Sequence, residues 1–87
     1  MYVIMVYDAV PKRGAKLLKY LRRHLTWVQN SVFEGEVTES ELEIIKKGIK
    51  DIINLEKDSV IYYLFHSQNY HEREVLGVER NEIESFI

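Results

Sequence analysis

The amino-acid sequence predicts one small α+β domain in which two helices lie on one face of an antiparallel sheet. Two stretches, residues 2–7 and 59–65, are apolar at almost every position, which is typical of strands that are covered on both faces. Two others, residues 12–24 and 38–53, repeat apolar residues three and four positions apart, which is the period of an amphipathic helix. A short hairpin between the two helices completes the order of elements.

The first strand leads through a loop into a basic helix. Residues 8–11 form the loop, and Pro11 suits the first turn of a helix because the N–H that it lacks would have no partner there. The apolar stripe of the helix consists of Leu17, Leu18, Leu21 and Leu25, and the opposite basic stripe of Lys12, Lys16, Lys19 and Arg23. A basic stripe is typical either of a solvated helix face or of a phosphate-binding surface, and the pattern leaves both open.

The hairpin and the second helix follow directly. We expect the hairpin strands at residues 27–29 and 32–37, with the turn near Asn30-Ser31. Thr38 and Glu41 have the spacing of a capping box, in which each side chain satisfies a backbone N–H at the start of a helix. The inward face of this helix consists of Leu42, Ile45, Ile49, Ile52 and Ile53, and the outward face of Glu43, Lys46, Lys47 and Lys50.

The C-terminal part completes the predicted topology. We expect strands at residues 59–65, more weakly at 71–78, and as a short tail at 82–87. The order β-α-β-β-α-β with an extra C-terminal strand is that of a ferredoxin-like fold with both helices on one face of the sheet. Residues 1–87 then form a single domain, with a core at 1–78 and a tail at 79–87.

The predicted sheet has more apolar surface than two helices can cover. In the strands at 2–7 and 59–65 both alternating sets of side chains are apolar, whereas helices on one face bury only one set. A second copy of the chain, packed sheet to sheet, would cover the other face and add buried surface to a domain of 87 residues. We therefore predict a homodimer, in which the tail strand pairs with the edge of the partner's sheet.

Composition narrows the class of protein. The chain has no Cys, so disulfides cannot stabilise it, and no Cys/His cluster suggests structural zinc. No apolar run approaches the roughly 20 residues of a membrane span, and no signal peptide precedes the first strand. We therefore expect a soluble, cytoplasmic protein that does not bind a membrane.

Charge is divided unevenly along the chain. Residues 1–33 carry six Lys and Arg against one acidic residue, a net charge of +5, whereas residues 34–87 carry six against thirteen, a net charge of −7. The positive half has the charge to bind phosphate while the acidic half stays in solvent. Segregation of charge in a small domain is also common without a function, so the charge alone leaves both interpretations open.

Asp8 is the most informative single residue. It ends the first strand, precedes the basic helix, and is the only acidic residue among the first 33. A carboxylate beside a positive surface suits a divalent metal held next to a phosphate. One carboxylate is too few for a metal site, so the other ligands would come from water, substrate or a second copy of the chain. The alternative is that Asp8 caps the first helix or its loop.

Two motifs carry a resemblance to a known family. Tyr7-Asp8 closes the first strand, and residues 29–35 have the sequence Gln-Asn-Ser-Val-Phe-Glu-Gly in the hairpin. With these motifs, the order of elements and the length, the chain resembles the CRISPR-associated protein 2 family. The resemblance implies a ferredoxin-like homodimer, described in many members as a metal-dependent endonuclease on single-stranded RNA or double-stranded DNA. Members also join the integrase subunit of the spacer-acquisition machinery and help to hold the DNA to be inserted.

The resemblance also assigns site residues. The strand-end Asp that binds the metal corresponds to Asp8, and the supporting Tyr and hairpin Phe to Tyr7 and Phe33. From the residues alone, ordinary core packing is the favoured interpretation of both aromatic side chains. Where some members have an Arg two residues before the hairpin Gln, this chain has Trp27, which either packs under the first helix or stacks on bases, as does Tyr20.

We therefore expect a homodimeric protein of the spacer-acquisition step that hydrolyses a phosphodiester bond. Its two Asp8 carboxylates are expected to hold Mg²⁺ between the protomers. The residues expected to bind nucleic acid are Lys12, Arg13, Lys16, Lys19 and Arg23. The alternative is a non-catalytic adaptor that bridges integrase dimers and holds DNA, with the acidic segment 72–87 as its docking surface. A toxin-like ribonuclease of related fold is a third possibility.

Overall fold

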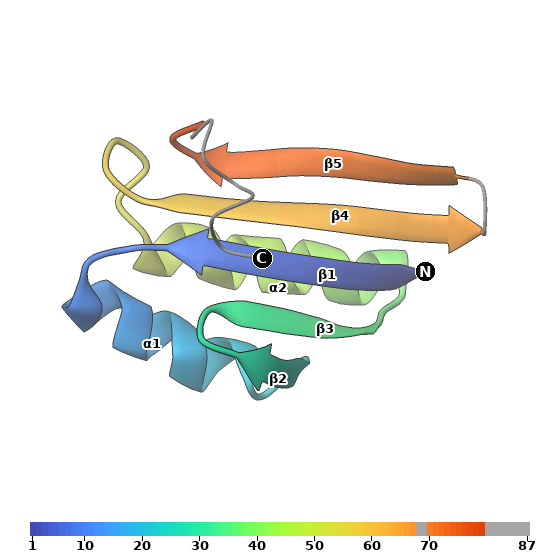
Figure 1. Cartoon of the computed structure of the whole chain (residues 1–87), viewed down its shortest axis with the longest axis horizontal. Coiled ribbons are helices and arrows are strands. Elements are labelled where there is room, and N and C mark those ends of the chain that lie inside the picture. Colours follow the sequence, from blue (N-terminus) through green and yellow to red (C-terminus); the bar gives the residue numbers. More distant parts are fainter. Residues whose placement is uncertain (68–69, 80–87) are drawn as a thin grey trace.

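Seven elements follow one another in the part of the chain that this computed structural model describes, residues 1–67 and 70–79 (Figure 1). They are β1 (Tyr2–Asp8), α1 (Pro11–Leu21), β2 (Thr26–Gln29), β3 (Val32–Glu36), α2 (Glu39–Ile52), β4 (Ser59–Ser67) and β5 (Tyr70–Gly77). This order confirms the predicted ferredoxin-like α+β fold with an extra strand after β4. The predicted tail strand at 82–87 lies outside the described residues.

All five strands form one antiparallel sheet in the order β2-β3-β1-β4-β5, so β1 lies at its centre. The register sets Met5 of β1 between Phe33 of β3 and Tyr62 of β4. Figure 1 shows α2 passing behind β1, on the face that the helices cover. Because alternate side chains of a strand point to opposite faces, Val3, Met5 and Tyr7 face the helices, while Ile4, Val6 and Asp8 face away from them.

The core lies between the helices and this face of the sheet. It is built from the apolar stripes that the sequence predicts, and its most deeply buried members are Val3, Met5, Leu17, Leu21, Phe33, Ile45, Ile49, Val60 and Tyr62. The two helices approach closely at Gly48, where an added Cβ would lie 2.0 Å from the hydroxyl oxygen of Tyr20. That hydroxyl donates to the carbonyl of Ile44 at 3.0 Å and so joins α1 to α2.

The capping box of α2 is confirmed. The backbone N–H of Glu41 donates to Oγ1 of Thr38 at 3.1 Å, and the N–H of Thr38 donates to Oε1 of Glu41 at 2.8 Å. The first helix is shorter than predicted, because residues 22–24 form turns after Leu21. Lys46 was predicted to point outward, but its side chain is half-buried over the Tyr62 ring, with Nζ 6.0 Å from the ring centroid.

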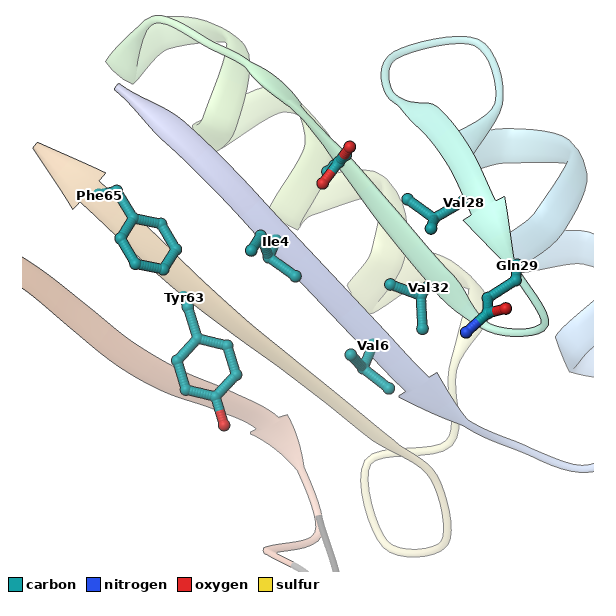
Figure 2. Close-up of a pocket in the computed structure, with 8 residues that line it drawn as sticks. Ile4, Val6, Val28, Gln29, Val32, Tyr63 and Phe65 are labelled. Atoms are coloured by element: carbon teal, nitrogen blue, oxygen red, sulfur yellow. The ribbon is translucent and has the colours of Figure 1, made fainter. Parts of the chain in front are cut away.

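Among residues 1–67 and 70–79, no helix or strand covers the face of the sheet away from the helices. A groove of about 410 Å³ runs along it, and its lining is mostly apolar (Figure 2). The lining residues are Ile4, Val6, Val28, Gln29, Val32, Glu34, Tyr63 and Phe65. Among residues 1–67 and 70–79, neither helix has the length and apolar composition needed to cross a bilayer.

Candidate active site

Asp8 is the last residue of β1 and lies opposite Ser59 of β4 in the sheet register. Its side chain is half-buried. The alternation along β1 puts Asp8 on the same face as Ile4 and Val6, both of which line the open groove. The carboxylate that the sequence singles out therefore stands at one end of an uncovered apolar surface.

The described residues do not form a complete metal site at this position. Among residues 1–67 and 70–79, no three His, Cys, Asp or Glu side chains lie close enough to hold an ion together. A carboxylate oxygen is nevertheless the kind of ligand that Mg²⁺ prefers, and Mg²⁺ sites in proteins commonly use one or two carboxylates with waters and a substrate phosphate. Asp8 fits such a site if further ligands come from beyond the described residues of this chain.

Tyr7 and Phe33 lie on the other face of the sheet from Asp8. Their rings are stacked, with centroids 6.2 Å apart and 24° between the planes, and Phe33 is fully buried. The Tyr7 hydroxyl donates to the carbonyl of Gly14 at 3.2 Å, and burial raises the pKa of this phenol. The backbone N–H of Tyr7 donates to the carbonyl of Ser31 at 3.2 Å. Both aromatic residues therefore hold the end of β1 against α1 and the hairpin, and their assignment to catalysis stays a prediction.

The predicted phosphate-binding side chains lie along the outer surface of α1 and the turns after it. Lys12, Lys16, Lys19 and Arg23 are all exposed, and so is Arg22, which the sequence pattern did not single out. None of these five side chains forms an ion pair with an acidic group in the described part of the chain. The result is a positive surface along α1, whose first turn follows the strand end that carries Asp8. Both interpretations of the basic stripe are compatible with it.

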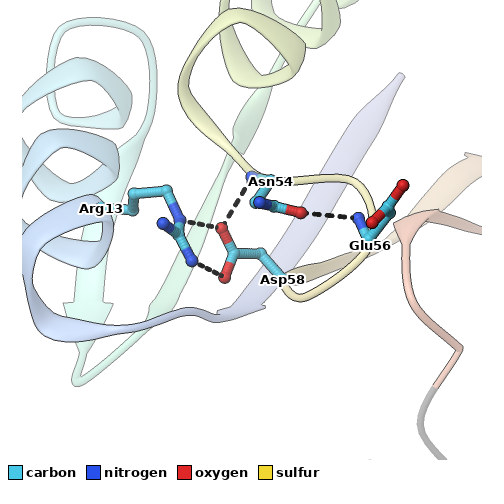
Figure 3. Close-up of polar contacts among 4 residues, drawn as sticks. All are labelled: Arg13, Asn54, Glu56 and Asp58. Carbon is cyan, nitrogen blue, oxygen red and sulfur yellow. Dashed lines mark hydrogen bonds and ion pairs between the residues drawn. The ribbon is translucent and has the colours of Figure 1, made fainter.

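Arg13 is placed differently from the other basic residues. Its Nε and one Nη bind the two carboxylate oxygens of Asp58, the second contact at 3.0 Å (Figure 3). Asp58 is 1% exposed and also accepts the N–H of Asn54 at 2.8 Å. The hydrogen bond from Arg13 lowers the pKa of the Asp58 carboxyl, against the smaller opposing effect of burial. The predicted role of Arg13 in binding nucleic acid remains a prediction, and in the structure this residue already has a protein partner.

The two aromatic residues near the basic surface differ in exposure. Tyr20 is half-buried between the helices, and its ring lies 4.9 Å from that of His24. Trp27, in contrast, is 47% exposed on the edge strand β2. Of the two predicted alternatives, Tyr20 therefore follows the packing one, whereas the exposed Trp27 is not packed under the first helix. The exposure of a side chain at a strand edge depends on its neighbours in space, so no local sequence signal could have separated the two.

A second groove, of about 260 Å³, lies where α2 meets β4 and β5, and it is bordered by acidic side chains. The acidic residues are Glu39, Glu43, Glu72 and Glu74. Within this groove the Tyr62 hydroxyl donates to Oε2 of Glu74 at 2.6 Å, and Nε2 of His66 lies 2.7 Å from Oε2 of Glu72. The described part of the predicted acidic docking segment, residues 72–79, therefore includes part of a concave acidic surface.

Comparison with known proteins agrees with this architecture. Residues 1–73 match the model of a family described as CRISPR associated protein Cas2. The CRISPR-associated endoribonuclease Cas2 of Pyrococcus furiosus is 54% identical over 87 residues, and that of Dictyoglomus turgidum 49% identical over 87 residues, with 100% of both chains covered in each case.

The fold comparison gives the same result. A crystal structure of Cas2 superposes with a TM-score of 0.73 at 39% identity, over 94% of this chain and 90% of that one. The match of the family model, the identity over the full length and the common fold together show that this chain belongs to the CRISPR-associated Cas2 family.

Proposed function

We propose that this chain is a Mg²⁺-dependent endoribonuclease of the spacer-acquisition step of a CRISPR system, with its site formed by Asp8 from two protomers of a homodimer. The observation that carries the proposal is the position of Asp8 at the end of the open apolar face of the sheet. The names of the Pyrococcus and Dictyoglomus relatives support the endoribonuclease activity. Double-stranded DNA is a second substrate to be tested.

The homodimer follows from the uncovered groove. An apolar groove of about 410 Å³ on a small domain is unfavourable in water, and covering it contributes roughly 25 cal/mol for each Å² of apolar surface buried. A second copy packed sheet to sheet covers it with an identical apolar surface. Because Asp8 lies on this face, a twofold axis near the strand ends brings two Asp8 carboxylates together.

Two carboxylates at close range repel one another unless one is protonated or a cation lies between them. Asp8 from each protomer would hold Mg²⁺ as that cation, and the bound ion would supply a water of lowered pKa for attack on the phosphorus of the substrate. The Asp8 pair holds the ion, while the exposed Lys12 and Lys16 bind the phosphate and stabilise the negative charge that develops on its oxygens. The attack forms one P–O bond as the bond to the leaving sugar oxygen breaks.

Cleavage of labelled single-stranded RNA and double-stranded DNA tests this proposal. We compare the wild type and Asp8→Ala, each with Mg²⁺ and with EDTA, after checking by light scattering that both variants are dimers. Cleavage that needs both Mg²⁺ and Asp8 supports the site and identifies its substrate. Cleavage that survives Asp8→Ala places the activity elsewhere, and a folded wild-type dimer that cleaves neither substrate contradicts the nuclease.

The acidic groove favours a second candidate function, an adaptor that bridges integrase subunits and holds DNA. Its Glu side chains, from both α2 and β5, form a concave surface of the charge that a basic partner would need. In this case Asp8→Ala leaves spacer acquisition in cells intact, whereas Glu72→Lys with Glu74→Lys abolishes it. The two functions are compatible, because the acidic groove and the end of β1 that carries Asp8 are different surfaces of the chain.

A further inference from the structure

Trp27 is a large aromatic side chain that lies on the other face of the sheet from the proposed sheet-to-sheet contact. It is 47% exposed, and every residue of its strand, β2, is exposed. In the β2–β3 pairing Trp27 lies opposite Phe33, so the two side chains share the face that bears the helices. The groove on the other face is lined by Val28 instead. The sheet-to-sheet contact itself therefore does not bury Trp27.

The indole ring of Trp27 is held in place by its own chain. Its Nε1–H donates to the carbonyl of Asn30 at 2.9 Å, at a turn where Asn30 has a φ of 46°. The guanidinium carbon of Arg22 lies 5.8 Å from the ring centroid, at the distance of a cation–π contact. The only polar atom of the ring is therefore satisfied. A ring with a fixed orientation loses little conformational entropy when a ligand packs against it.

The surroundings of Trp27 have the charge and the position expected of a nucleic-acid contact. Arg22 and Arg23 follow α1 and extend the basic surface of that helix up to the ring. The hairpin turn also connects Trp27 to the candidate site. The carbonyl of Asn30 accepts the indole N–H of Trp27. The carbonyl of the next residue accepts the backbone N–H of Tyr7, which directly precedes Asp8. An aromatic ring beside a positive track is the arrangement by which proteins bind unpaired bases.

We propose that Trp27, flanked by Arg22, is a stacking platform for one unpaired base of single-stranded RNA. This inference rests on the proposed function and specifies the form of its substrate. In a duplex the faces of the bases are covered by their neighbours, so a stacking platform selects single strands or unpaired ends. A strand of another protein adding to the edge of β2 is the competing occupant.

The fluorescence of Trp27 reports on this contact directly, because the chain has one Trp. The wild type in EDTA, which prevents Mg²⁺-dependent cleavage, is titrated with a short unstructured RNA and with the same RNA annealed to its complement. We expect the single strand to quench the emission and the duplex to leave it nearly unchanged. Trp27→Leu weakens binding of the single strand about tenfold, while Trp27→Phe retains most of the affinity.

Two controls separate stacking from charge and from loss of structure. Trp27→Leu leaves the slope of log K against log [salt] unchanged, since no positive charge is removed. Leu55→Ala, which truncates another exposed apolar side chain, leaves the affinity unchanged. Circular dichroism and thermal unfolding verify that each variant is folded.

The outcomes distinguish this inference from the proposed function. RNA that binds without quenching, and with equal affinity to Trp27→Leu, overturns the stacking platform and leaves the nuclease intact. Absence of RNA binding by the wild type overturns the platform, and cleavage with Mg²⁺ then decides separately on the nuclease. A change in oligomeric state on Trp27→Leu, with RNA affinity unchanged, assigns the edge of β2 to a protein partner and overturns the platform.

Discussion

The guanidinium of Arg13 and the buried carboxylate of Asp58 form an ion pair between residues 45 positions apart (Figure 3). The pair joins the first turns of α1 to the loop that enters β4. Asp58 directly precedes Ser59, which lies opposite Asp8 in the register of β1 and β4. The ion pair therefore secures both chain segments that flank the candidate metal ligand.

We expect Arg13→Met to lower the free energy of unfolding by about 3 kcal/mol, because it leaves the Asp58 carboxylate buried without its cation. Urea unfolding followed by circular dichroism measures the change. Lys12→Met is the matched control, since it removes an exposed charge from the same helical turn, and its effect should stay within about 0.5 kcal/mol. Equal effects of the two substitutions would show that the ion pair does not stabilise the fold.

The same pair predicts how stability depends on pH. The bond from Arg13 holds the pKa of Asp58 below that of the unfolded chain, which is about 3.9. A lowered folded-state pKa gives a contribution that is fully present above the unfolded pKa and is lost as the pH falls through the folded pKa. The difference in free energy of unfolding between wild type and Asp58→Asn should therefore be constant near neutral pH and shrink below about pH 4. A difference that is equal at neutral and acidic pH contradicts this account.

The basic surface of α1 predicts a salt dependence of RNA binding. Replacing Lys12, Lys16 and Lys19 by Gln should weaken binding of single-stranded RNA and reduce the slope of log K against log [salt] by up to about 0.7 for each phosphate that is no longer neutralised. Fluorescence anisotropy at several salt concentrations gives the slope. The control replaces Lys47, Lys50 and Lys57 by Gln, which removes the same charge elsewhere. Equal slopes in the two triple variants would exclude α1 as the phosphate-binding surface.

The open face of the sheet predicts which substitution separates the protomers. Phe65 lines the groove and is 36% exposed in the single chain, so Phe65→Glu should leave the fold intact but place a charge in the dimer interface. We expect sedimentation to show a monomer, and cleavage to disappear because the second Asp8 is no longer present. Ile44→Glu, at a 59% exposed position on α2, is the control and should remain a dimer. A dimeric Phe65→Glu variant that still cleaves would contradict the sheet-to-sheet arrangement.

Much of the fold could be predicted from the sequence because its signals are local. The apolar period of residues 12–24 and the capping box at Thr38 depend on neighbours within a few positions, and both correspond to helices in the structure. The helix predicted at 12–24 runs over Pro11–Leu21 in the structure, and residues 22–24 form turns instead. The apolar character of both faces of residues 2–7 predicted a strand covered on both sides. The helices cover one side, an apolar groove lies on the other, and the second copy expected to cover that groove stays a prediction.

The sequence by itself determined the order of elements and the positive surface of α1, and it marked Asp8 as a candidate, since each follows from residue type and short-range spacing. Only the tertiary structure decided which side chains meet. It paired Arg13 with Asp58, placed Asp8 at the end of the apolar groove, and left Trp27 exposed with Arg22 beside its ring. Such contacts depend on strand register and on the distance between segments far apart in the chain, and no local pattern of apolar and charged residues encodes them.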